Sequence, residues 1–162
     1  MEIHTFEPSY TNITKLNARF ANDKLIKILP FALSDKKGSA TLFSDYAGSG
    51  LGSLTKRKIE HFNIAFNVTE KIETLCFEDY WKNNLSERTL DIVKIDIEGH
   101  ELAAFRGFGN AINSTRVIQF EFGGCNIDTR TYFQDFWYFF KDHGFNIFRI
   151  TPLGAEHIKR YS

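Results

Sequence analysis

The segment that decides the fold is Leu90 to Glu101, which reads LDIVKIDIEGHE. Its first eight residues are rich in Ile, Val and Leu and lack strict alternation, which is typical of a strand buried on both faces of a sheet. Gly99 permits a tight turn at the end of that strand. HELAAFRGF (residues 100–108) is compatible with a helix. We therefore predict a buried strand, a turn and a helix over residues 90–108.

The same alternation extends in both directions from this segment. Further strands are predicted at residues 3–6, 25–33, 70–74, 117–122 and 146–151, with a hairpin-like extension at 39–44. Helices are predicted at residues 9–22, 75–84 and 131–144. Buried strands that alternate with helices indicate an α/β fold with a doubly wound sheet. A chain of 162 residues fits a single domain, which we place at 1–162.

Composition excludes several classes of protein. Twenty basic residues balance twenty acidic ones, so the charge pattern of a nucleic-acid-binding protein is missing. No apolar run reaches the roughly 18 residues needed to span a bilayer, and the first residues do not form a signal peptide. Cys76 and Cys125 show neither zinc-type nor CxxC spacing, which favours reduced thiols. We expect a soluble cytoplasmic protein that binds neither nucleic acid nor membranes.

Acidic residues lie where three predicted strands end. Glu7 closes the first strand, Asp96 and Glu98 close the 90–97 strand, and Glu121 lies near the end of the next one. Ligands of open parallel sheets bind outside the carboxyl ends of the strands. A carboxylate in the position of Glu7 could accept hydrogen bonds from both ribose hydroxyls of a nucleoside cofactor. The alternative for Glu7 is an ordinary solvated acid.

The turn after the 90–97 strand holds further candidates. An ionised Asp96 is costly on so apolar a strand unless it has a partner or a function. His100 could act as a general base near neutral pH, although a lone surface histidine is the commoner case. Glu101 could simply complement the dipole of the helix that it starts. The histidines form no zinc-type pattern, and Asp96 with Glu121 is weak evidence for a cation, so no metal site is predicted.

Two loops are candidate substrate contacts. GSGLGS (48–53) does not fit a phosphate-binding fingerprint and is interpreted as a flexible lid or a plain connector, with Ser49 as a contact. The cations at 56–58 could attract an anionic group, although short charge runs are usually solvated. GGCNID (123–128) offers Gly124 and Asn126 to a polyhydroxyl substrate, or forms an ordinary turn.

Five blocks of the sequence, in order, resemble the FkbM-type methyltransferase family: HTFEPSYTNITKLNARF, ALSDKKGSATLF, IETLCFEDYW, DIVKIDIEGHELAAFRGF and VIQFEF. The resemblance implies a Rossmann-like class I methyltransferase sheet with flanking helices. It also implies S-adenosylmethionine as cofactor and O-methylation of a saccharide or secondary metabolite. By position, the family pattern assigns the cofactor ribose to Glu7, the adenine edge to Ala32, Leu33, Ser34 and Asp35, the methyl-transfer site to Asp96, and acceptor orientation or deprotonation to Glu98, His100 and Glu121.

This sequence departs from the family at its beginning. Family members carry a strand and a D-x-G-A-N-x-G turn before the FEP block, and this chain starts after that point. The resemblance therefore implies a domain that is incomplete at its N-terminus, lacks the first strand with its glycine-rich turn, and is clipped near residues 161–162. An unpaired central sheet position favours association, so a homo-oligomer is one expectation. A catalytically inactive Rossmann-like binding or association module is the alternative to an enzyme.

Overall fold

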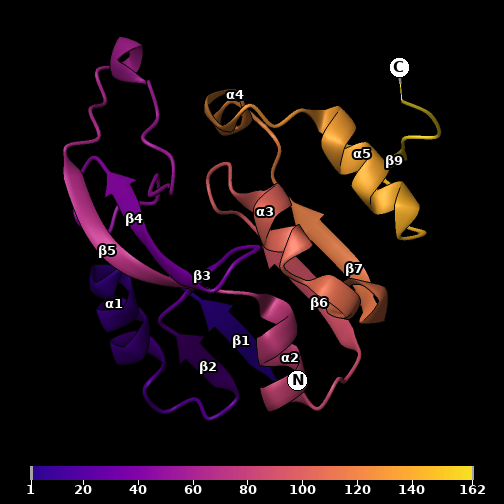
Figure 1. Cartoon of the computed structure of the whole chain (residues 1–162), viewed down its shortest axis with the longest axis horizontal. Coiled ribbons are helices and arrows are strands. Elements are labelled where there is room, and N and C mark those ends of the chain that lie inside the picture. Colours follow the sequence, from indigo (N-terminus) through magenta and orange to yellow (C-terminus); the bar gives the residue numbers. More distant parts are fainter. Residues whose placement is uncertain (1, 162) are drawn as a thin grey trace.

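The computed structural model describes residues 2–161 as a mixed α/β fold (Figure 1). Met1 and Ser162, where the sequence predicts incomplete ends, lie outside the described residues. The first half contains β1 (Ile3–Phe6), α1 (Tyr10–Phe20), β2 (Ile26–Leu29), β3 (Ala32–Leu33), β4 (Gly38–Ser44), η1 (Glu60–Phe62), β5 (Val68–Leu75) and α2 (Phe77–Leu85). The second half contains β6 (Leu90–Ile95), α3 (Glu101–Arg106), η2 (Gly109–Ser114), β7 (Thr115–Phe120), α4 (Cys125–Thr129), α5 (Phe133–Asp142), β8 (Phe148–Thr151) and β9 (Gly154–His157).

The parallel strands form three separate pairings, so one continuous doubly wound sheet is not seen among the described residues, and β3 pairs with β5 in a sheet that also holds β4. β1 pairs with β2, and β6 pairs with β7. Within residues 2–161, β1 and β6 each have hydrogen-bonded neighbours on one side only, because no strand of this segment joins them. The helix α2 lies between the two pairs in the view of Figure 1. The described residues thus form a mixed α/β fold with small separate sheets.

Pro30 divides the predicted 25–33 strand, so the expectation of one doubly buried strand is wrong. β2 ends before it and pairs with β1, whereas β3 follows it and pairs with β5. Proline lacks the N–H that a continuous sheet ladder requires, which explains the break. The predicted 39–44 extension forms β4, which pairs antiparallel with β5 across the long 45–67 loop.

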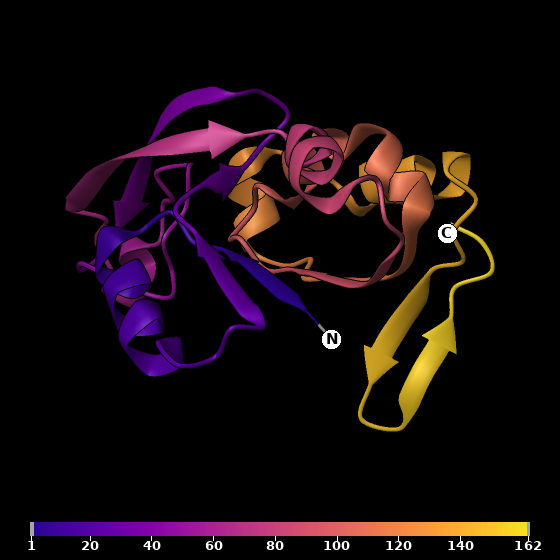
Figure 2. The ribbon, with the colours of Figure 1, turned by 90° about the horizontal axis from the view of Figure 1, so that it is seen from below.

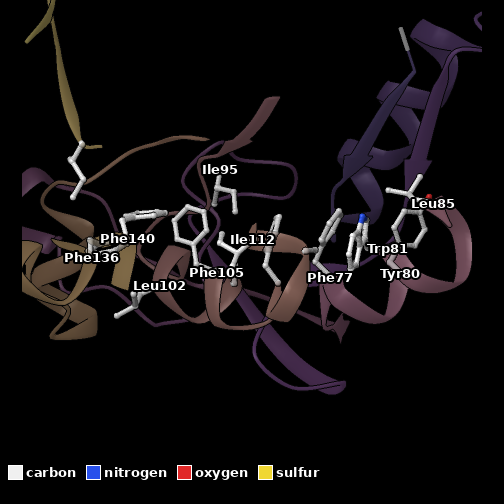
Figure 3. Packing of buried hydrophobic residues seen from close by; sticks show 14 of the residues in the cluster. Phe77, Tyr80, Trp81, Leu85, Ile95, Leu102, Phe105, Ile112, Phe136 and Phe140 are labelled. Carbon is white, nitrogen blue, oxygen red and sulfur yellow. The ribbon is translucent and has the colours of Figure 1, made fainter. Parts of the chain in front are cut away.

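One face of the β6–β7 pair carries the hydrophobic core. α2, α3 and α5 pack there, and Phe105 lies between Phe140 and Ile112, next to Ile95 (Figure 3). The side chains of the opposite face stay in solvent: Ile92 on β6 is 70% exposed, and Val117 on β7 is 54% exposed. The helices therefore cover only one side of this pair, and the expectation that the strand after Leu90 is buried on both faces is wrong.

The last predicted strand does not join either parallel pair. β8 pairs antiparallel with β9 in a hairpin that extends away from the helices (Figure 2). Thr151 closes its turn by donating a hydrogen bond from its hydroxyl to the carbonyl of Gly154. Among residues 2–161, no helix combines the length and apolar character needed to cross a membrane.

Candidate functional site

Two carboxylates meet where the parallel strands β6 and β7 end. Ile95 pairs with Phe120 in the sheet register, so the next residues, Asp96 and Glu121, stand side by side. The Glu121 N–H donates to the carbonyl of Ile95 across 3.3 Å, which keeps the two strand ends together. The negative charge of Asp96 raises the pKa of Glu121. This exposed pair can accept a proton.

The turn after β6 is organised by a buried acid. The side chain of Glu101 is completely buried, and its Oε1 accepts hydrogen bonds from the N–H groups of Ile97 (3.1 Å) and Gly99 (3.0 Å). Its Oε2 is buried without a hydrogen-bond partner in the described chain. A Cβ on Gly99 would lie 2.9 Å from the Cys125 carbonyl, and φ there is +101°. Glu101 is therefore more than the solvated helix-start acid that its position suggests.

We expect Glu101→Ala to destabilise the fold by about 2–3 kcal/mol, because two buried N–H groups would lose their acceptor. Glu101→Gln keeps an oxygen in the same place and should cost less. Urea unfolding monitored by circular dichroism measures both values. An alanine variant within 0.5 kcal/mol of the wild type would contradict this role.

Glu98 takes part in a partly buried ion cluster at the same turn. Its backbone is left-handed (φ 55°), and its Oε2 lies 2.6 Å from Nη1 of Arg57 in the 45–67 loop. Arg57 Nε lies 3.5 Å from Oδ2 of Asp128 in α4. Burial raises the pKa of Glu98, and the Arg57 guanidinium opposes that rise. Glu98 thus contacts the 45–67 loop.

His100 lies on the side of the β3 segment. Its Nε2 is 3.0 Å from the hydroxyl of Ser34, which is also 3.3 Å from Oδ1 of Asp35. Burial lowers the pKa of His100, which favours the neutral imidazole, and the nearby charge of Asp35 opposes this shift. The end of α3 approaches the backbone of Ser34 so closely that a Cβ on Gly107 would come within 1.9 Å of the Ser34 carbonyl oxygen. Only a glycine fits at this position. Ser34, Asp35 and His100 form one group, with Ala32 and Leu33 leading into it in β3.

Glu7 is half-buried where β1 ends, as the sequence predicts. Its Oε1 accepts the N–H of Ser9 at 2.8 Å, just before α1. Burial raises its pKa, and the Ser9 N–H opposes the rise. The turn that holds Ser49 lies against the same helix, because a Cβ on Gly48 would meet the Thr11 side chain at 2.7 Å. The Ser49 hydroxyl accepts the N–H of Leu51 inside its own turn.

The predicted substrate contacts after β7 lie at the start of α4. Gly124 is exposed and precedes the helix. The Asn126 side chain is 1% exposed, and its Oδ1 accepts the N–H of Gly123 at 2.9 Å. Its Nδ2 is buried and has no partner among the described residues. Asn126 therefore shapes the loop after β7 from inside.

The structure brings Asp96 and Glu121 together at the strand ends. It places Glu98, Gly124 and Asn126 near α4, and His100, Ser34 and Asp35 near β3, whereas Glu7 and the turn of Ser49 lie beside α1. The sequence analysis did not predict that Arg57 is largely shielded from solvent. The one hint in the sequence is the acid Asp128 in GGCNID, which could have been considered as an ion-pair partner for a cation of residues 56–58. Among residues 2–161, no group of three or more His, Cys, Asp or Glu side chains is placed to hold a metal ion.

Comparisons with known proteins agree with the resemblance of the sequence. The model of the methyltransferase FkbM domain matches residues 2–147. No curated protein and no solved structure matches the chain. The family match spans the strand-end acids, the Ser34–His100 contact and the Arg57 cluster, and it covers most of the chain. The chain therefore belongs to the FkbM methyltransferase domain family and is a methyltransferase.

Proposed function

We propose that this methyltransferase transfers a methyl group from S-adenosylmethionine to a hydroxyl of a saccharide or a similar small metabolite. The observation that carries the proposal is the Asp96–Glu121 pair, in which one carboxylate raises the pKa of the other where two parallel strands end. A carboxylate with a raised pKa is a better proton acceptor for a hydroxyl than an ordinary surface acid. The pair is exposed, so an acceptor can reach it.

The residues present fit the nucleoside end of the cofactor. One carboxylate oxygen of Glu7 accepts the N–H of Ser9. The carboxylate has further lone pairs, which could accept hydrogen bonds from the two hydroxyls of a ribose. Leu33 is only partly buried and lies close in sequence to the exposed acid Asp35, which suits an adenine ring and its amino group, whereas Ala32 is packed into a hydrophobic cluster. Ser34 would be held in place for that contact by His100.

The chemistry asks little of the protein beyond positioning and proton removal. S-adenosylmethionine, when bound, supplies a methyl group on a positively charged sulfur. The Asp96–Glu121 pair would orient the acceptor hydroxyl and take its proton as the oxygen gains the methyl group and the bond from that methyl group to sulfur breaks. Glu98 is held by Arg57, so we assign it to the wall of the site, and His100 to the cofactor side.

Glu7→Ala should weaken the binding of S-adenosylhomocysteine between about tenfold and hundredfold, because one or two hydrogen bonds to a charged group are lost. Calorimetric titration would measure the affinity. It should be run on the chain itself and on a fusion that places a D-x-G-A-N-x-G strand from a family member ahead of residue 1. Glu2→Ala is the matched control, because Glu2 lies at the other end of β1 and pairs with exposed Lys27. Binding by neither form would refute the proposal and favour the inactive module.

Transfer itself can be followed with radiolabelled S-adenosylmethionine and a panel of methyl hexosides as acceptors. O-methylation requires the label to enter a hexoside as an ether, which resists mild base, whereas a methyl ester does not. The saccharide acceptor would be refuted if a form of the protein that binds S-adenosylhomocysteine transferred no label to any hexoside of the panel.

A further inference from the structure

Arg57 is largely shielded from solvent, although it belongs to the short run of cations at residues 56–58. Its side chain is only 12% exposed, and the side chains of its partners Glu98 and Asp128 are 21% and 18% exposed. A buried guanidinium is costly unless it is paired. Glu98 accepts a hydrogen bond from Nη1, and Asp128 lies within ion-pair distance of Nε, which has no hydrogen-bond partner among the described residues. Arg57 thus joins parts of the chain that lie far apart in sequence.

Three segments meet at this arginine. The 45–67 loop contributes Arg57 and also Ser53, whose hydroxyl donates to the carbonyl of Glu98 at 2.8 Å. The turn after β6 contributes Glu98 and Gly99, and the latter packs against the start of α4. α4 contributes Asp128. The loop and α4 lie at the same end of the molecule as this turn (Figure 1).

The geometry of Glu98 shows that its side chain is held from outside the turn. A non-glycine residue at φ 55° is uncommon and persists where surrounding contacts fix it. Here the backbone carbonyl of Glu98 is fixed by Ser53 and its carboxylate by Arg57. Asp96 is two residues away, so a shift of this turn would also move the proposed proton acceptor.

We propose that Arg57 is a positioning residue, which fastens the 45–67 loop and α4 to the turn after β6 and so forms the acceptor-side wall of the site. The proposal rests on the proposed function for what the wall binds. Its planar guanidinium can engage two carboxylates at once, whereas a lysine ammonium on a flexible stem cannot reproduce that fork. Loss of the bridge should therefore loosen acceptor binding and leave cofactor binding, on the β1 and β3 side, unchanged.

Arg57→Gln tests this, with Arg57→Lys as the conservative variant and Lys56→Gln as the matched control. Lys56 is exposed and adjacent, so its substitution makes the same charge change without touching the cluster. The readouts are amide hydrogen exchange of residues 46–58 and 124–130, the affinity for S-adenosylhomocysteine, and KM and kcat for the hexoside of the panel that turns over fastest.

For Arg57→Gln we expect amide exchange in both segments to accelerate about tenfold or more and KM to rise about tenfold, since a charge-assisted pair is lost. The affinity for S-adenosylhomocysteine should stay within twofold, Arg57→Lys should recover part of the KM, and Lys56→Gln should match the wild type. Unchanged exchange in both segments would overturn the proposal. Equal losses in KM and cofactor affinity would also overturn it, because they indicate general unfolding. Exchange needs no acceptor, so it tests Arg57 even if the proposed function fails.

Discussion

Phe105→Ala is expected to destabilise the protein by about 3–5 kcal/mol, the range for removing a fully buried aromatic ring. The ring is completely buried in α3, and Figure 3 shows it in the middle of the cluster. Its neighbours are five rings with centroids 5.0–6.5 Å away: Phe108 just after α3, Phe120 on β7, and Phe136, Phe139 and Phe140 on α5. The rings of Phe120, Phe136 and Phe140 meet it edge to face, and these contacts add to the area that the ring buries.

The measurement is urea unfolding of Phe105→Ala beside two comparison variants. Phe105→Leu keeps an apolar side chain and should cost clearly less. Phe62→Ala removes a ring that is 67% exposed on η1 and should cost under about 1 kcal/mol. If Phe105→Ala costs no more than Phe62→Ala, the helices do not pack on β6 and β7 as described.

The parts of the fold that sequence predicts well are those fixed by local pattern. The apolar run from Leu90 becomes β6, and the helix expected after Gly99 is α3. The aromatic segment that the sequence ends at Gly144 forms α5, since its apolar residues repeat at helical spacing. These elements need no information from distant residues.

The parts that sequence predicts poorly depend on pairing across the chain. LIKILPFAL looks like one buried strand, yet Pro30 sends its two halves to different sheets. Pairing between β1 and β6 is a non-local property, and no local pattern reports that the two strands stay apart.

The same division holds for the candidate site. The acids at strand ends could be found from sequence, because parallel strands that lie side by side bring their ends together. Glu101 and Arg57 could not, because burial of a charge depends on partners elsewhere in the chain. The contact of His100 with Ser34 joins residues 66 positions apart and has no sequence signal either.

Asp96→Asn is expected to lower kcat by about 10²–10⁴, the usual contribution of a positioned proton acceptor. Asparagine keeps the size of the side chain and removes its negative charge, so the fold should tolerate it. Asp91→Asn is the matched control on the same strand, since Asp91 is exposed and pairs only with exposed Arg116 at 3.2 Å. Its kcat should equal that of the wild type, because surface ion pairs contribute little.

The pH dependence separates loss of a proton acceptor from loss of structure. Asp96 raises the pKa of Glu121, so in the wild type the acid limb of kcat should lie above the range of an ordinary glutamate. In Asp96→Asn the neighbouring charge is gone and the pKa of Glu121 falls. The acid limb of the residual activity should therefore move to lower pH, whereas partial unfolding would lower the rate without moving it. A variant within threefold of the wild-type kcat, or an acid limb that stays in place, would remove the pair from the mechanism.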